Sequence, residues 1–281
     1  MSQSSEVKTK STASWEYSRA KRVGTLQLDS QLLVLLARAR TVRKHFDKTV
    51  RNWTWKLDLQ GGEIVFMEQG TGRILLSSPV KLVGTENKQA KTFLFSWADP
   101  ELHEEWGVVS GLGGLRVAAR DACLSVFDEP AAFTLTSTTN PSALAHSVAV
   151  FLGSSFVFES QERTKVRYLT VEQSTEAVGV SLTGEEVVEL IEWATRRYPF
   201  THRTAIYAYL GKPTGAGAST LSEEILYWAM GEATLRVVLD HQGILREIGL
   251  EKPTVAEPEP IRVPEPQTKP GLLTRLFGKH R

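Results

Sequence analysis

Cysteine is nearly absent from this chain of 281 residues, in which Cys123 is the only one. One thiol excludes an intrachain disulfide and a zinc site built from cysteines. Cys123 itself stands on an expected apolar face, where a buried thiol is inert. A chain without disulfides is typical of a reducing compartment, so we expect a cytoplasmic protein.

Long hydrophobic runs and an excess of one charge are missing as well. The segment from Met1 to Arg22 is polar and lacks the apolar run of a secretory signal. No stretch reaches the roughly 20 apolar residues that a membrane-spanning helix needs. The chain has 33 Lys and Arg residues against 32 Asp and Glu residues, a formal net charge of +1. This balance removes the chain-wide electrostatic argument for nucleic acid, and we predict no nucleic-acid partner.

Motifs that carry catalysis or bind a cofactor are lacking too. The six histidines are scattered without the H-x-x-x-H or H-E-x-x-H spacing of a metal site. The glycines from Gly111 to Gly114 lack both the G-x-G-x-x-G pattern and the G-K-[ST] ending of phosphate loops, so a flexible turn is favoured. The sequence therefore predicts no cofactor and offers no positive argument for an enzyme.

One short segment does gather a histidine and four acidic residues: Asp99, Glu101, His103, Glu104 and Glu105. Such a cluster could bind a hard cation or act as acid and base. Acidic residues are also favourable at a helix start without any further role, and this interpretation is preferred. For Trp53 and Trp55, which share one face of an expected strand, a core is favoured over a ligand pocket. Trp97, Asp99 and His103 remain candidates for lining a pocket in the first module.

What the chain does contain is globular, since 41% of its residues are hydrophobic and seven are tryptophan. Its length exceeds the usual size of one domain, so two modules are expected. We predict an α+β protein in which each module is an antiparallel sheet packed with helices. The expected parts are a disordered segment 1–24, a module 25–172 with a four-stranded meander, a module 173–251, a proline-rich linker 252–270 and an amphipathic basic tip 271–281.

Hydrophobic periodicity outlines the first module. A helix is predicted to begin near Asp29, whose carboxylate can cap it, because apolar residues recur at helical spacing from Leu32 to Phe46. Four basic residues lie mainly off that stripe, where a solvated face is favoured over nucleic-acid contact: Arg38, Arg40, Arg43 and Lys44. Strands are expected at 53–59, 64–67, 74–83, 92–97 and 165–171, and helical segments at 100–106, 115–127 and from Pro141, which Asn140 caps.

A family resemblance rests on these elements. The Trp53-Thr54-Trp55 strand, the Gly-Gly turn before Glu63 and the strand ending in Phe95-Ser96-Trp97-Ala98-Asp99-Pro100 resemble an uncharacterised bacterial family, the domain of unknown function numbered 6882. The resemblance covers roughly residues 28–172. Members often show Trp-x-Trp-Ala-x-Asn where this chain has Phe95 to Asp99. The resemblance implies a fold but no activity.

The second module begins with the capping-box form Thr183-Gly184-Glu185-Glu186, which predicts a helix through Arg197. A second helix is expected from Thr201 to Leu210, a loop at 215–222, and strands at 224–230, 232–240 and 244–251. Two helices followed by antiparallel strands resemble the fold of the small lipoprotein of the outer-membrane assembly machine and of the β-lactamase inhibitor protein. That resemblance implies a fold and a bias toward protein binding.

The last part of the chain looks like a tethered ligand. Six of the twelve prolines lie in the nineteen residues from Lys252 to Pro270, which would extend about 50–60 Å as polyproline II. On a helix the tip would carry its apolar residues on one face and positive charge beside them: Leu272, Leu273, Leu276 and Phe277, with Arg275 and Lys279. Ordering so short a helix needs a surface to fold on.

The sequence therefore favours a non-catalytic bacterial interaction or adaptor protein that recruits an unknown protein partner through this tip. Peripheral attachment of the same tip to an anionic membrane is one alternative. A small-molecule binder or enzyme that uses a pocket of the first module is another. A tip that packs back on the protein's own body and an inert tail are the remaining alternatives to recruitment.

Overall fold

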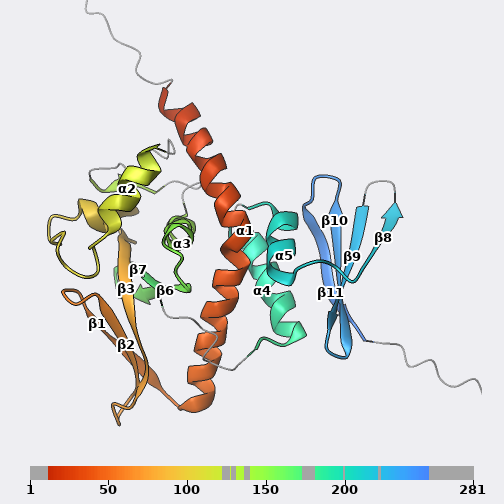
Figure 1. Ribbon diagram of the computed structural model, residues 1–281, viewed down its shortest axis with the longest axis horizontal. Helices are drawn as coiled ribbons and strands as arrows, with labels where there is room; N and C mark the ends of the chain where they lie inside the picture. The colour runs from red at the N-terminus through yellow and green to blue at the C-terminus, as the bar shows by residue number, and fades with distance from the viewer. Residues whose placement is uncertain are drawn as a thin grey trace, which may run out of the picture.

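The computed structural model describes residues 12–121, 127, 131–135, 140–172, 181–198, 200–220 and 223–252, with side chains described from Asp29 onward except at 118–121 and 218–220. Two antiparallel sheets are each packed with helices (Figure 1), which confirms the predicted α+β class. Cys123 and all six predicted partner-binding residues of the tip lie outside the described residues: Leu272, Leu273, Arg275, Leu276, Phe277 and Lys279.

Helix α1 (Thr12–Thr49) runs through the middle of the molecule between the two sheets (Figure 1). It begins before the predicted start near Asp29. Asp29 is therefore not a cap. It lies inside the helix, buried, and its carboxylate accepts a hydrogen bond from the Thr201 amide at 3.0 Å.

The first sheet contains seven strands: β1 (Trp53–Asp58), β2 (Glu63–Glu68), β3 (Ile74–Asn87), β4 (Thr92–Phe95), β5 (Phe133–Thr134), β6 (Phe156–Gln161) and β7 (Lys165–Val171). The predicted meander β1-β2-β3-β4 is present, and β5 extends it. The first half of β3 pairs with β2, and its second half pairs with β4 on one side and β7 on the other. Strand β6 was not predicted, and it pairs with β7.

Three helical elements accompany this sheet: η1 (Ser96–Ala98), α2 (Leu112–Asp121) and α3 (Pro141–Leu152). Helix α3 is capped as predicted, because the Asn140 side chain accepts from the amides of Ser142 and Ala143 at 3.0 and 3.2 Å. The predicted helical segment 100–106 is wrong. It forms isolated turns, in which the Asp99 carboxylate and carbonyl hold the amides of Glu101 and Leu102.

The second module consists of α4 (Gly184–Arg197), α5 (His202–Leu210) and a sheet in the order β11-β10-β9-β8. Its strands are β8 (Gly215–Thr220), β9 (Glu223–Met230), β10 (Ala233–Asp240) and β11 (Leu245–Glu251). The capping box is confirmed, since the Glu186 amide donates to Thr183 Oγ1 at 3.3 Å and the Thr183 amide to Glu186 Oε2 at 2.7 Å. The loop predicted at 215–222 is wrong, because Gly215–Thr220 forms an edge strand against β9.

The two sheets share α1. Leu32, Leu33 and Leu36 pack with α4, α5 and the second sheet, whereas Val42 and Phe46 pack with the first sheet. A helix that is apolar on two sides must be covered on both. The predicted boundary between the modules therefore does not divide the cores, because α1 belongs to both.

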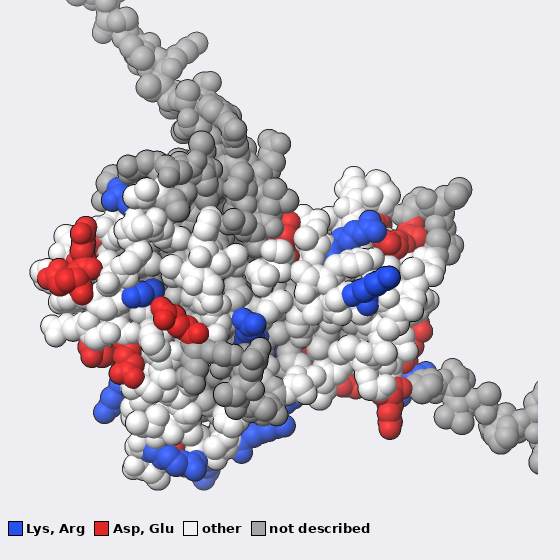
Figure 2. Space-filling model, in the orientation of Figure 1, with Lys and Arg blue, Asp and Glu red and all other residues white. Residues whose placement is uncertain are grey.

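Both signs of charge occur on the face shown in Figure 2, and Lys and Arg gather at its lower edge, where α1 ends. Among the helices within the described ranges, none combines the length and the hydropathy that crossing a bilayer requires.

Candidate functional site

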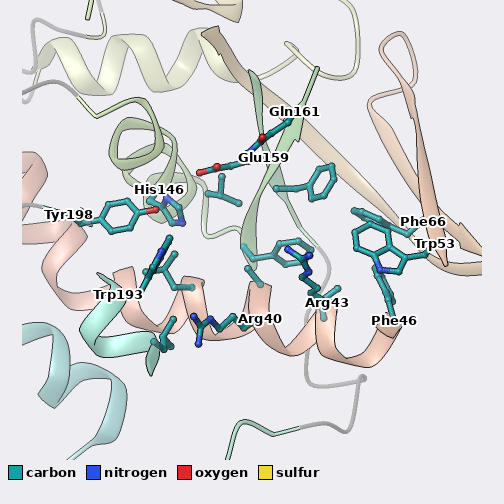
Figure 3. Close-up of a pocket in the computed structure, with 17 residues that line it drawn as sticks. Arg40, Arg43, Phe46, Trp53, Phe66, His146, Glu159, Gln161, Trp193 and Tyr198 are labelled. Carbon is teal, nitrogen blue, oxygen red and sulfur yellow. The ribbon is translucent and has the colours of Figure 1, made fainter. Parts of the chain in front are cut away.

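A cavity of about 390 Å³ lies where α1 meets α3, α4, β6 and the first two strands (Figure 3). Its volume falls within the usual range of small-molecule sites. Both modules contribute to it, since Leu190, Trp193 and Tyr198 come from the second module and the rest of the lining from the first.

Helix α1 forms one wall of the cavity with a single face. That face carries residues at the spacing i, i+3, i+4, i+7 and i+10: Leu36, Ala39, Arg40, Arg43 and Phe46. Arg40 donates to the Glu186 carbonyl oxygen at 3.3 Å and lies 3.9 Å from the Glu189 carboxylate. Arg43 Nε lies 3.8 Å from the Asp47 carboxylate, and 75% of the Arg43 side chain is exposed. Two arginines thus interrupt an otherwise apolar face.

One end of the cavity is aromatic. Phe46 and Phe66 are buried, and their rings meet Trp53 edge-on at centroid distances of 5.4 and 6.0 Å. Phe158 packs perpendicular to Phe66 at 5.0 Å. Trp53 packs against the hydrophobic core between α1 and the first sheet, as predicted, and also lines the cavity. Such edge-to-face contacts fix the ring positions and give a firm apolar wall.

The other end holds a buried polar network centred on Ser142. Its hydroxyl donates to the Glu159 carboxylate and meets the Tyr198 hydroxyl at 2.8 Å, so it joins β6 to the residue that ends α4. His146 Nδ1 lies 2.6 Å from the Ser142 carbonyl oxygen. Burial lowers the pKa of His146 to about 4 and raises the pKa of Tyr198 to about 12. At neutral pH both rings are therefore uncharged.

This geometry does not make Ser142 a nucleophile. A carbonyl oxygen can only accept, so His146 Nδ1 must carry the proton in that 2.6 Å contact. The same nitrogen, 3.5 Å from the Ser142 hydroxyl, cannot then act as the base for it. The network positions side chains and links elements.

Trp193 stands at the mouth of the cavity. It is among the exposed large apolar side chains of the described residues, at 36% exposure. The Arg197 guanidinium lies 5.4 Å from its ring centroid, and the Tyr198 ring packs edge-on at 5.7 Å. An exposed tryptophan beside an apolar cavity is a common feature of binding sites.

The three pocket candidates from the sequence lie elsewhere, and none of them lines this cavity. Trp97 stacks on Phe95 at 4.3 Å and donates to the Phe127 carbonyl oxygen at 3.2 Å. Asp99 caps a turn through the Glu101 amide, and His103 packs against Trp106 at 5.0 Å. In the part of the chain that the structure describes, no group of three or more His, Cys, Asp or Glu side chains could hold a metal ion.

Residues 28–172, just over half of the chain, match the model of a family of unknown function, DUF6882. The chain belongs to this family. The DUF6882 segment supplies α1 from Leu28, the aromatic wall and His146, whereas Trp193 and Tyr198 lie beyond it. No curated protein and no solved structure was found to match the chain. The resemblance of the second module to the lipoprotein and inhibitor fold stays a prediction.

Proposed function

We propose that this protein is a binding protein that holds a small molecule in the cavity between its two modules. The observation that carries the proposal is the cavity itself, which combines an aromatic wall, a few polar groups and lining residues from both modules. Small-molecule sites have this composition and lie preferentially between domains. The proton held on His146 Nδ1 keeps this nitrogen from acting as a base for Ser142.

The neutral fluorophore N-phenyl-1-naphthylamine tests this proposal, because its emission rises in apolar sites. We expect saturable binding to the full chain that is lost in Ala39→Phe, since a ring at this position of α1 fills the cavity. Val117→Phe adds bulk at an exposed apolar position of α2 and is the matched control. Equal binding by both variants, with unchanged far-ultraviolet spectra, would contradict the proposal, and so would absence of binding to the native chain.

A second proposed role concerns the tip 271–281, as an adaptor that recruits a protein partner in the cytoplasm. The adaptor role is supported by the amphipathic basic pattern of the tip. Strand β11 ends at the exposed Glu251, so the linker leaves the body at its surface. Leu250 anchors this end of the strand against Gly184 at the start of α4. From there the proline-rich linker is long enough to carry the tip far from the body.

Deletion of 271–281 is the test of the adaptor role. Affinity capture with the full chain is expected to retain partners that the shortened chain loses. Identical partners for both chains would reject recruitment by the tip. Salt-sensitive flotation of the full chain, but not the shortened one, with anionic vesicles would assign the tip to a membrane surface instead.

A further inference from the structure

We infer that the ligand of the cavity is an amphipathic carboxylate, whose apolar body lies on the aromatic wall while its carboxylate meets Arg40 and Arg43. The inference rests on the proposed function of the cavity as a small-molecule site, and it names the chemical class of the ligand.

The two arginines have donors to spare. A guanidinium has five N–H donors. Arg40 gives one to the Glu186 carbonyl oxygen, and its nearest ion-pair partner, Glu189, lies at 3.9 Å with 72% of its side chain exposed. Within the described ranges, the ion-pair partner of Arg43 is the exposed Asp47 at 3.8 Å. Exposed pairs at such distances are weak and easily exchanged. Both side chains can therefore turn to a carboxylate, which the arginine fork binds with two parallel hydrogen bonds.

Their placement favours one shared anion. Arg40 and Arg43 are three residues apart on α1 and are neighbours on its surface, and both line the cavity (Figure 3). A helix face that contacts a core is normally apolar, and two positive charges on this face give a carboxylate at the cavity two oppositely charged partners.

The charged groups that line the cavity also favour an anionic ligand. Arg40 and Arg43 are its positive groups, and Glu159 is its carboxylate, already engaged by the Ser142 hydroxyl. His146 is neutral at physiological pH. Lys and Arg also gather around the end of α1 in Figure 2. A neutral or cationic ligand would gain no charge-assisted hydrogen bond from either guanidinium group.

The apolar part of the lining suits a chain or flat ring system. The α1 face from Leu36 to Phe46 spans about 15 Å at 1.5 Å per residue. Phe46, Phe66 and Phe158 provide a continuous aromatic surface at one end of it. Each CH₂ of a ligand buried there is expected to raise affinity about fourfold.

Displacement of N-phenyl-1-naphthylamine from the full chain provides the test. Decanoate, decanol and decyltrimethylammonium share one apolar chain and differ in charge. We expect decanoate to displace the fluorophore at concentrations about tenfold or more below decanol, since hydrogen bonds to charged groups carry that preference. The ammonium compound is expected to be weakest. A series from octanoate to decanoate should show the increase per CH₂.

Arg43→Gln is expected to reduce the preference for decanoate over decanol about tenfold, and Arg40→Gln to act in the same direction. Arg51→Gln removes an exposed arginine just beyond α1 that does not line the cavity, and it should leave the preference unchanged. The inference is overturned if decanol and decanoate displace the fluorophore equally, or if the preference for decanoate survives both arginine variants. Either result leaves the proposed function standing. Absence of fluorophore binding rejects both.

Discussion

At the polar end of the cavity, one residue, Ser142, stabilises the fold through two hydrogen bonds. Ser142 is buried, and its hydroxyl is shared by Glu159 of β6 and Tyr198 at the end of α4. A polar group that loses its partner inside a protein keeps the cost of its own desolvation. The serine hydroxyl therefore stabilises two other side chains as well as itself.

Ser142→Ala is expected to lower the free energy of unfolding by about 1–3 kcal/mol, because Glu159 and Tyr198 both lose a buried partner. Urea unfolding followed by tryptophan fluorescence measures the loss. Ser77→Ala is the control, since Ser77 is exposed and also donates to a glutamate, Glu63. Equal losses of unfolding free energy in both variants would show that the buried network stabilises the fold no more than an exposed hydrogen bond does.

His146 predicts a specific pH dependence. Burial holds its pKa near 4 in the folded protein, below the ordinary value of 6.5. The unfolded chain thus binds a proton between these values that the folded protein does not, so stability is lost as the pH falls from about 6.5 to about 4. The total is up to about 3 kcal/mol.

The difference in unfolding free energy between the native chain and His146→Gln isolates this group from the carboxylates. It should shrink as the pH is lowered across that window, because the glutamine does not titrate. The exposed His241→Gln is the control and should run parallel to the native chain. A constant difference for His146→Gln would mean that the buried ring is protonated at no cost.

At the site, residue types could be predicted from the sequence but their assembly could not. The sequence places Arg40 and Arg43 beside the helical stripe, and the packing of α4 and β6 against α1 makes them part of a cavity wall. His146 and Tyr198 are far apart in sequence and meet through a long-range contact at 5.6 Å. The acidic segment around Asp99 and His103 resembles a site because its residues are close in sequence, but the Asp99 carboxylate bonds only locally, to the Glu101 amide.

At the level of elements, the sequence is most informative where a local interaction fixes an end. The Thr183 capping box and the Asn140 cap lie at the predicted positions. Strands β6 and β8 were missed for different physical reasons. β8 is a Gly- and Ala-rich edge strand that is held by backbone pairing with β9, and β6 is specified by its pairing with β7 rather than by an alternating pattern.

The turn between β1 and β2 shows how an element can depend on a close approach. Gly62 has a φ of +69°, and a Cβ there would lie 2.4 Å from the Gly107 backbone. Gly72 has a similar φ of +71° with open space around it. Gly62→Ala is expected to cost well over 2 kcal/mol and Gly72→Ala about 1 kcal/mol, since only the first adds a backbone clash. Thermal unfolding of the two variants should differ clearly, and similar midpoints would argue against this contact.

At the scale of the whole molecule, α1 makes the two modules one unit. Leu32, Leu33 and Leu36 are buried by the second module although they belong to the DUF6882 segment. The Asp29 carboxylate also holds the Thr201 amide, and Lys44 pairs with Glu186 at the start of α4. The boundary predicted from the change of pattern near residue 173 is a boundary along the chain only.

The isolated segment 28–172 is therefore expected to fold poorly, because it would expose the apolar α1 face that the second module covers. The full chain should unfold in a single transition by fluorescence and circular dichroism. A fragment 28–172 that unfolds cooperatively at the same temperature as the full chain would contradict the shared core.

The central claim is that the cavity between the modules is a ligand site, and crystallography with a halogenated ligand tests it most directly. Crystals of the full chain grown with decanoate brominated at its last carbon should give a bromine anomalous peak against Phe46 and Phe66, with the carboxylate at Arg40 and Arg43. A well-ordered bromine peak elsewhere on the protein, with this cavity filled only by water, would contradict the claim.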